Sequence, residues 1–260
     1  MYLVFVPLFV FLNLRFVRPE INPLSSAPTI TPAPVSYTFA VISDIHSSYK
    51  NLQKALQRIK QDGGEFIIIA GDLTTAGKAQ ELRKVKEILD ESGIPYYAIP
   101  GNHDLLSTPI GRKGEGWQEV LEVDYQSFQK GEVKFILINN GDGKIGVDQT
   151  QQEWLNQELV DCPKLYCLVF AHMPLNHLTL KHIMGEDSLV VASQAAQLVQ
   201  EFTRYQVKEL FAGHIHYLST YTLDGLKTTT DGVIKDRPRF LEVTVHQPET
   251  KIEEKQIWLE

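Results

Sequence analysis

Cysteine is scarce in this chain of 260 residues, which has only Cys162 and Cys167. A single C-x4-C pair lacks the second pair of ligands that a zinc finger or zinc ribbon needs, and it does not indicate a disulfide scaffold. Cys167 lies inside the apolar run Leu165–Phe170. We therefore favour the interpretation of a buried free thiol.

Blocks of lysine or arginine are also missing, and the formal net charge is -7. Nucleic acid is therefore disfavoured as the main partner, and a nuclease is an alternative that the charge argues against. The chain is otherwise 43% apolar and 22% charged, which is ordinary for a globular protein. Its length suits one large domain or two small ones.

The amino terminus departs from this composition. Residues 1–19 begin with the apolar run MYLVFVPLFVFL and predict a signal or membrane-anchor segment, and residues 20–36 form a linker rich in Pro, Ser and Thr. We expect a secreted or membrane-associated protein, with the extracytoplasmic side favoured. Arg15 and Arg18 follow the run, however, so the alternative is an anchor facing the cytoplasm. A first strand packed on the core is a third interpretation.

The folded domain is expected over residues 37–260, where strand and helix patterns alternate. Its first half predicts a parallel sheet from three strands and two helices, at Tyr37–Ser43, Asn51–Lys60, Glu65–Ala70, Lys78–Asp90 and Tyr96–Ile99. Further strands are predicted at Val133–Ile138, Leu165–Ala171 and Glu209–Ala212, with helices at Gln149–Leu159 and Val190–Tyr205. The tail alternates in Phe240–His246 and Gln256–Leu259, as antiparallel strands do. Two packed sheets with helices outside would account for the pattern.

Five of the predicted strands end in residues that can bind a metal. The side chains are Asp44 and His46, Asp72, Asn102 with His103 and Asp104, His172, and finally His214 and His216. Each alone has an ordinary explanation as a helix cap, a turn residue or a surface histidine. Ligands of open α/β sheets bind just beyond the carboxyl ends of the strands, so five such loops predict one shared site.

In this order, the motifs D-x-H, GD, GNHD, a strand-end His and GHxH resemble those of the calcineurin-like metallophosphoesterase superfamily. The motifs run from Asp44 to His216. The resemblance implies an α/β fold, a four-layer α/β/β/α sandwich of two mixed sheets flanked by helices. It also implies two metal ions bridged by Asp72, one held by Asp44, His46 and His216 and the other by Asn102, His172 and His214. His103 would then be the general acid, oriented by Asp104.

Nitrogen and oxygen ligands without thiolate suit two divalent ions of Mn, Fe, Zn, Co or Ni, among which the sequence does not choose. Metal coordination lowers the pKa of water from about 15.7 to near 7, so a metal-bound hydroxide would attack phosphorus in line. His103 would protonate the leaving oxygen. We expect hydrolysis of phosphodiesters or phosphomonoesters, with a small-molecule substrate and with diesters favoured. The alternative from another class is a catalytically silent binding scaffold, which the loss of a ligand would favour; none is lost.

Departures from the motifs narrow the subfamily. Thr75 stands where purple acid phosphatases have Tyr, and GDLTTAG and GNHD differ from the GDxVDRG and GNHE of protein serine/threonine phosphatases. Tyr125–Ile138 and Gln152–Leu155 resemble the bacterial branch that includes the class III cyclic-nucleotide phosphodiesterases. Leu106 replaces an Arg that is frequent there, which puts cyclic-nucleotide specificity in doubt.

Substrate choice is expected to lie in the loops Leu105–Glu119 and Met173–Leu189. We interpret the polar and aromatic side chains of these loops mainly as solvated or packed rather than as substrate-binding. The residues concerned are Arg112, Lys113, Trp117, His177 and His182.

Overall fold

A computed structural model of the chain describes residues 36–106, 115–236, 238–247 and 249–260. They belong to one compact unit bounded by Pro34 and Glu260. The predicted signal or anchor and nearly all of the linker lie outside the described residues, as do Arg112 and Lys113. Within the described ranges, no helix combines the length and apolarity needed to cross a membrane.

The first sheet has the order β11-β10-β1-β2-β3. Its parallel part and the two helices that connect it are β1 (Ser36–Ile42), α1 (Tyr49–Gln61), β2 (Phe66–Ala70), α2 (Ala79–Ser92) and β3 (Tyr96–Ile99). Each crossover helix buries one apolar face, because its apolar residues recur at intervals of three and four. The tail adds the predicted antiparallel strands β10 (Arg239–His246), which pairs with β1, and β11 (Lys251–Trp258), which pairs with β10.

The second sheet has the order β4-β5-β6-β7-β9-β8. Its strands are β4 (Gln126–Lys130), β5 (Val133–Leu137), β6 (Tyr166–Ala171), β7 (Glu209–Ala212), β8 (Ser219–Leu223) and β9 (Leu226–Thr230). Strands β5, β6, β7 and β9 are parallel, and β4 and β8 are antiparallel edges. The helices of this half are α4 (Gln149–Leu159) and α5 (Leu189–Arg204), with the short 3₁₀ helix η2 (Cys162–Lys164) before β6. The short helices η1 (His103–Leu105) and α3 (Glu115–Val120) follow β3, and α3 packs beside α2.

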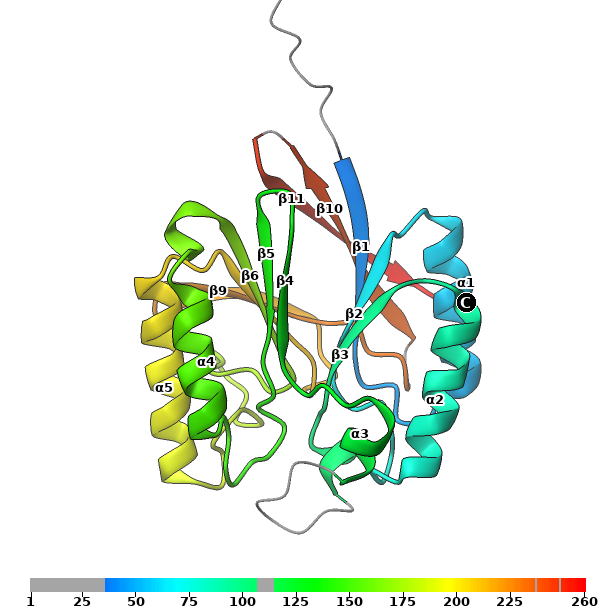
Figure 1. Cartoon of the computed structure of the whole chain (residues 1–260), viewed down its shortest axis with the longest axis horizontal. Helices are drawn as coiled ribbons and strands as arrows, with labels where there is room; N and C mark the ends of the chain where they lie inside the picture. The colour runs from blue at the N-terminus through cyan, green and yellow to red at the C-terminus, as the bar shows by residue number, and fades with distance from the viewer. Residues whose placement is uncertain (1–35, 107–114, 237, 248) are drawn as a thin grey trace, which may run out of the picture. The chain divides into compact units, whose positions relative to one another are not determined.

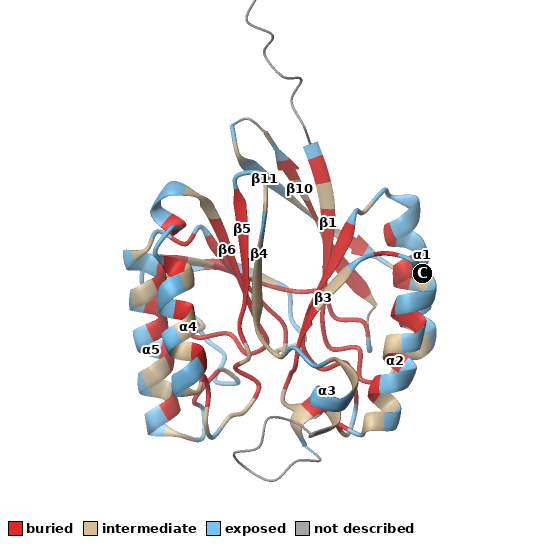
Figure 2. Ribbon diagram, viewed as in Figure 1, coloured by how far each residue is buried: buried red, intermediate tan, exposed pale blue. Residues whose placement is uncertain are grey.

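The two sheets pack face to face, with α1 and α2 outside one and α4 and α5 outside the other (Figure 1). The expected four-layer sandwich is therefore confirmed. Between the sheets lies an aromatic core in which Phe39 packs edge-on against Phe135, and Phe170 stacks on Phe211. Buried residues fill the central strands and the inner faces of the helices, whereas the outer helix faces are exposed (Figure 2).

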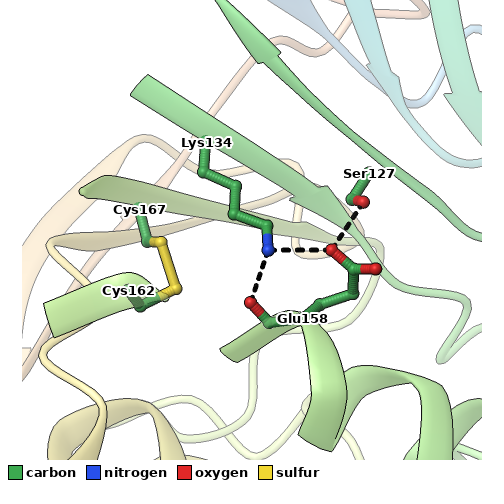
Figure 3. Close-up of a disulfide and its surroundings, with 5 residues drawn as sticks. All are labelled: Ser127, Lys134, Glu158, Cys162 and Cys167. Carbon is green, nitrogen blue, oxygen red and sulfur yellow. Dashed lines mark hydrogen bonds and ion pairs between the residues drawn. A yellow bond between two sulfur atoms is a disulfide. The ribbon is translucent and has the colours of Figure 1, made fainter. Parts of the chain in front are cut away.

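A disulfide joins Cys162, in η2, to Cys167, in β6, so the expectation of a free thiol was wrong (Figure 3). The burial expected for Cys167 is confirmed, and Cys162 is fully buried as well. The pairing was missed because η2 turns the chain back on itself and brings the two Cα atoms to 5.3 Å. Beside it, the Lys134 ammonium reaches the carboxylate of Glu158 at 2.9 Å, and Ser127 donates to the same carboxylate.

We expect loss of the disulfide to lower the free energy of unfolding by about 2 kcal/mol, which is what closing so short a loop contributes by chain entropy. The test is urea unfolding of the wild type and of the double variant Cys162→Ala/Cys167→Ala, with and without dithiothreitol. Reductant should shift the wild-type midpoint and leave the variant unchanged. A wild-type midpoint insensitive to reductant would contradict the prediction.

Glu209, at the start of β7, is a second buried feature with a measurable consequence. Burial and the neighbouring Glu254 raise its pKa to about 7, against the opposing effects of Lys227 and Thr229. The Lys227 ammonium lies 2.8 Å from this carboxylate but is itself partly exposed, so we give the effect of burial more weight. A raised pKa means that the folded state keeps a proton that the unfolded chain releases above pH 4.5.

Stability should therefore fall as pH rises from about 4.5 to 7, and Glu209→Gln should remove part of that fall, roughly 2–3 kcal/mol at the shift given. The measurement is urea unfolding of both proteins at pH 5 and pH 8. Glu253→Gln, at an exposed position of β11, is the control. Identical pH dependence of wild type and Glu209→Gln would show that this carboxyl is not responsible.

Candidate metal centre

The loops that follow β1, β2, β3, β6 and β7 meet at one edge of the sandwich. Backbone hydrogen bonds tie them together, since Asp44 N–H donates to Gly71 O at 3.1 Å and Gly213 N–H donates to His172 O at 3.0 Å. Glycine is needed where they touch. A Cβ on Gly101 would lie 2.2 Å from Asp72 Oδ1, and a Cβ on Gly213 would lie 2.8 Å from Asp44 Oδ2.

The backbone of the predicted ligands is unusual. Five of the seven residues have the left-handed φ that L-residues rarely adopt: Asp44 at 51°, His46 at 45°, Asp72 at 56°, His214 at 66° and His216 at 52°. Such conformations cost free energy and persist only where the surrounding contacts hold them, as they do at functional sites. They lie just after β1, β2 and β7.

One cluster contains Asp44, His46 and His216. Asp44 Oδ2 accepts from the Ser43 hydroxyl at 2.6 Å and from the His214 backbone N–H at 3.0 Å. Its Oδ1 lies 3.2 Å from His216 Nε2 and 3.9 Å from His46 Nε2. The two imidazole nitrogens are 3.3 Å apart. One oxygen of the carboxylate is thus held by the protein, and the other faces two ring nitrogens.

The second cluster contains Asn102, His172 and His214. His172 Nε2 lies 3.0 Å from Asn102 Oδ1 and 3.2 Å from His214 Nδ1. The other ring nitrogen of His172, Nδ1, is 2.8 Å from the Ala70 carbonyl. That contact fixes the ring orientation and leaves the Nε2 lone pair for a ligand.

Asp72 lies between the two clusters. Its Oδ2 is 3.5 Å from His46 Nε2 and 3.4 Å from His172 Nε2. Its Oδ1 accepts from the His103 backbone N–H at 2.8 Å. The structure therefore brings all seven predicted ligands together, with one carboxylate oxygen nearly equidistant from both clusters.

These residues fit two divalent ions. Asp44 Oδ1 is fully buried and has no hydrogen-bond partner among the described residues, as expected for an atom directed at a cation. Burial outweighs the opposing charges of Asp72 and Asp44 and lowers the pKa of His46 to about 4. The ring is therefore neutral, and its lone pair is available to a metal. Burial and His172 likewise lower the pKa of His214. Aspartate, imidazole and amide donors suit several transition ions and do not single one out.

Metal binding to His172 must displace a proton. Burial alone would lower the pKa of this imidazole, but Asp72 and Asp44 outweigh it and raise the pKa to about 9. Since a metal binds only the neutral imidazole, an ion at this cluster competes with that proton.

Asp104 does not orient the His103 ring as expected. Its carboxylate accepts from the backbone N–H groups of Gly101, Leu73 and Thr74 and from the Thr74 hydroxyl, at 2.7–3.1 Å. Burial and the charge of Asp72 nevertheless raise its pKa to about 6. The physical reason for the difference is this set of four donors, which takes up both oxygens. Asp104 ties the loop after β2 to the loop after β3.

The ring of His103 is held by a residue that the sequence did not indicate. Its Nδ1 lies 2.8 Å from the Thr75 carbonyl, and the ring packs edge-on against His46 at 4.5 Å between centroids. Asn140, after β5, was also missed. Its side-chain oxygen accepts from the backbone N–H of His172 and of Met173, which fixes the loop after β6. Its place at the end of a predicted strand was the available signal.

A cavity of about 360 Å³ lies over the ligands and includes His103, His182 and Lys235 in its lining. A second cavity, of about 480 Å³, adjoins it between the loops after β3, β5 and β6. Trp117 is buried and donates to the Val123 carbonyl, as its packing interpretation predicted. His182 is exposed but lines both cavities.

A four-layer α/β/β/α sandwich with an aspartate shared between two histidine-rich clusters defines a class of dinuclear metalloproteins. Residues 37–218 match the calcineurin-like phosphoesterase family, and the chain belongs to that family. The resemblance seen in the motifs is thereby confirmed.

The similar proteins include one named as a phosphatase and one named as a phosphodiesterase. The chain is 27% identical over 188 residues to a rat protein named serine/threonine-protein phosphatase CPPED1, covering 65% of this chain and 59% of that one. It is 26% identical to a probable glycerophosphodiester phosphodiesterase of Arcobacter nitrofigilis, covering 68% and 65%. A dimetal phosphatase structure from Danio rerio matches the fold with a TM-score of 0.64 and 15% identity, over 86% of this chain and 99% of that one. The chain thus spans about three-fifths of the length of the first relative.

Proposed function

We propose that this protein hydrolyses phosphoric esters of small molecules at a dinuclear metal centre. The observation that carries the proposal is the position of Asp72 Oδ2, at 3.5 Å from His46 Nε2 in one cluster and 3.4 Å from His172 Nε2 in the other. Each of the seven positions where the motifs predict a metal ligand carries a side chain that can bind a metal, which argues against a catalytically silent binding scaffold.

Two bound divalent ions would polarise the phosphoryl oxygens and lower the pKa of a coordinated water. The protein would supply the rest. The Thr75 carbonyl, by accepting from Nδ1–H, would hold the His103 ring, whose protonated form would give the Nε2 proton to the departing oxygen. Lys235, in the lining of the same cavity, would attract the phosphate anion.

We propose both phosphomonoesters and phosphodiesters as substrates, with diesters favoured. The cavity of about 480 Å³ beside the metal ligands supports this preference, since it would accommodate a second ester substituent. The named diesterase from Arcobacter nitrofigilis supports it too. The phosphatase name of the rat protein keeps phosphoserine and phosphothreonine peptides among the substrates to be tested, although the GDLTTAG and GNHD motifs differ from those of the protein phosphatases.

The test is turnover of the full chain, reconstituted with Mn²⁺, on bis(4-nitrophenyl) phosphate, 4-nitrophenyl phosphate and a phosphothreonine peptide. We expect turnover that chelation removes and Mn²⁺ restores, with the diester hydrolysed fastest. No turnover of any of the three by protein with two bound ions would overturn the proposal.

We also propose an extracytoplasmic location, with membrane association through residues 1–19. The Cys162–Cys167 disulfide supports this, because structural disulfides persist mainly in oxidising compartments. Protease accessibility of the protein on intact cells would test it. A protein degraded only after cell lysis would favour the alternative of an anchor facing the cytoplasm.

A further inference from the structure

His182 occupies the junction of the two cavities. Three residues line both of them, namely Asn102, His214 and His182. The first two belong to the candidate metal centre. His182 is therefore a side chain that a phosphoester would meet if its phosphate lay at the metals and one of its alcohol groups lay in the larger cavity.

The position of His182 is set by its surroundings. Its ring stacks on that of His214, with 4.1 Å between centroids and 19° between planes. Its Nδ1 lies 2.9 Å from Glu186 Oε2. Between these two residues, the buried Met184 donates its backbone N–H to Pro174 O and contacts the Asn140 amide through sulfur. The loop is thereby anchored at its centre, while its two polar side chains contact each other.

Gly185, which follows Met184, explains why the loop cannot shift easily. Gly185 has φ of 88°, and a Cβ there would lie 2.3 Å from Ala192 N in α5. The turn carrying His182 and Glu186 thus packs directly on a helix. A pair fixed in this way can select a ligand, because little order has to be gained on binding.

The chemistry offered to the larger cavity is mainly that of hydrogen-bond acceptors. A carboxylate only accepts, so Glu186 offers acceptor oxygens and the contact with it makes Nδ1 of His182 the donor. Asp142 and Asp187 also line the cavity, against the single cation of Lys144 among its lining residues. Leu105 and Ile183 supply apolar surface. Such a lining suits hydroxyl or ammonium groups and repels anions.

We propose that the His182–Glu186 pair determines substrate specificity by selecting phosphodiesters whose second alcohol carries a hydroxyl or ammonium group, and by disfavouring those with an anionic group. This inference rests on the proposed function. The pair acts on the substituent in the larger cavity and leaves the reacting phosphoryl group to the metal ligands and His103.

The experiment uses three diesters of 4-nitrophenyl phosphate that share one leaving group. Their second alcohols are ethanolamine, ethylene glycol and 3-hydroxypropanoate, so one two-carbon chain ends in an ammonium, a hydroxyl or a carboxylate. We expect wild-type kcat/KM to fall in that order. Glu186→Gln and His182→Asn should each reduce the ratio of ammonium to carboxylate substrate by roughly tenfold, largely through KM, with the metal content unchanged.

The matched control is the exposed pair His246–Glu253, which crosses the β10–β11 hairpin at 3.6 Å. His246→Asn and Glu253→Gln should leave the ratio as in the wild type. An unchanged ratio in Glu186→Gln and His182→Asn, with all three substrates still hydrolysed, would overturn the inference alone, as would a wild-type preference for the carboxylate. No hydrolysis of any diester by the metal-loaded wild type would overturn the proposed diesterase function and this inference with it.

Discussion

Asp72→Asn should lose metal and turnover together, with kcat/KM falling roughly 10³-fold or more, because two ions held as we propose would lose a shared ligand and one unit of negative charge. Asparagine nearly preserves the shape of the side chain and keeps an oxygen for the His103 N–H, which Asp72 Oδ1 accepts at 2.8 Å. The loop should therefore stay in place. The measurements are metal content after gel filtration and turnover of a chromogenic diester over a range of Mn²⁺ concentrations.

Asp62→Asn is the matched control for Asp72. Asp62 directly follows α1 and forms an ion pair with Arg58 in the last turn of that helix, away from the strand-end loops. This variant should bind metal and turn over substrate as the wild type does. An Asp72→Asn protein that retained two ions and full activity would show that Asp72 is not a ligand shared by the two ions.

His103→Gln should keep both ions and lower kcat by about 10²–10⁴-fold for esters with poor leaving groups, the usual contribution of a general acid. The loss should be much smaller for 4-nitrophenyl esters, since nitrophenolate departs without a proton. The measurement is a plot of log kcat against the pKa of the leaving alcohol for wild type and variant. The variant should have the steeper slope.

Metal content should be measured alongside, because His103 lies close enough to His46 and Asp72 for the three side chains to hold one ion. His246→Asn serves as the control histidine on β10. An equal loss across all leaving groups would exclude a role as the acid. A lost ion in His103→Gln would instead indicate that the ring is a ligand.

The parallel strands and their crossover helices could be predicted from sequence because burial on both faces leaves a continuous apolar run. Ile67, Ile68 and Ile69 in β2 are all fully buried. The strand-end ligands could be predicted for a related reason. Each follows such a run directly, and a shared sheet edge brings residues from distant motifs together without any knowledge of the connecting loops.

The missed elements lack these signals. Strand β4, with the sequence QSFQK, is a polar edge strand of intermediate burial, and its alternation is too short to stand out. The contacts of Asp104 and Asn140 run mainly to backbone groups, which every residue has, so no spacing of side-chain types reveals them. The disulfide depended on the fold of one short turn. Metal ligands are recognisable in a sequence because their chemistry is rare, whereas the residues that position them use chemistry that is common.

The left-handed backbone at Asp44, His46, Asp72, His214 and His216 means that the apo domain folds around a region that lowers its stability. Ions that bind only the folded chain add stability that grows logarithmically with their free concentration. The fraction of folded protein would then depend on how much metal its compartment provides. Under metal scarcity, this family member would lose activity twice, once through unfilled sites and once through a smaller folded population.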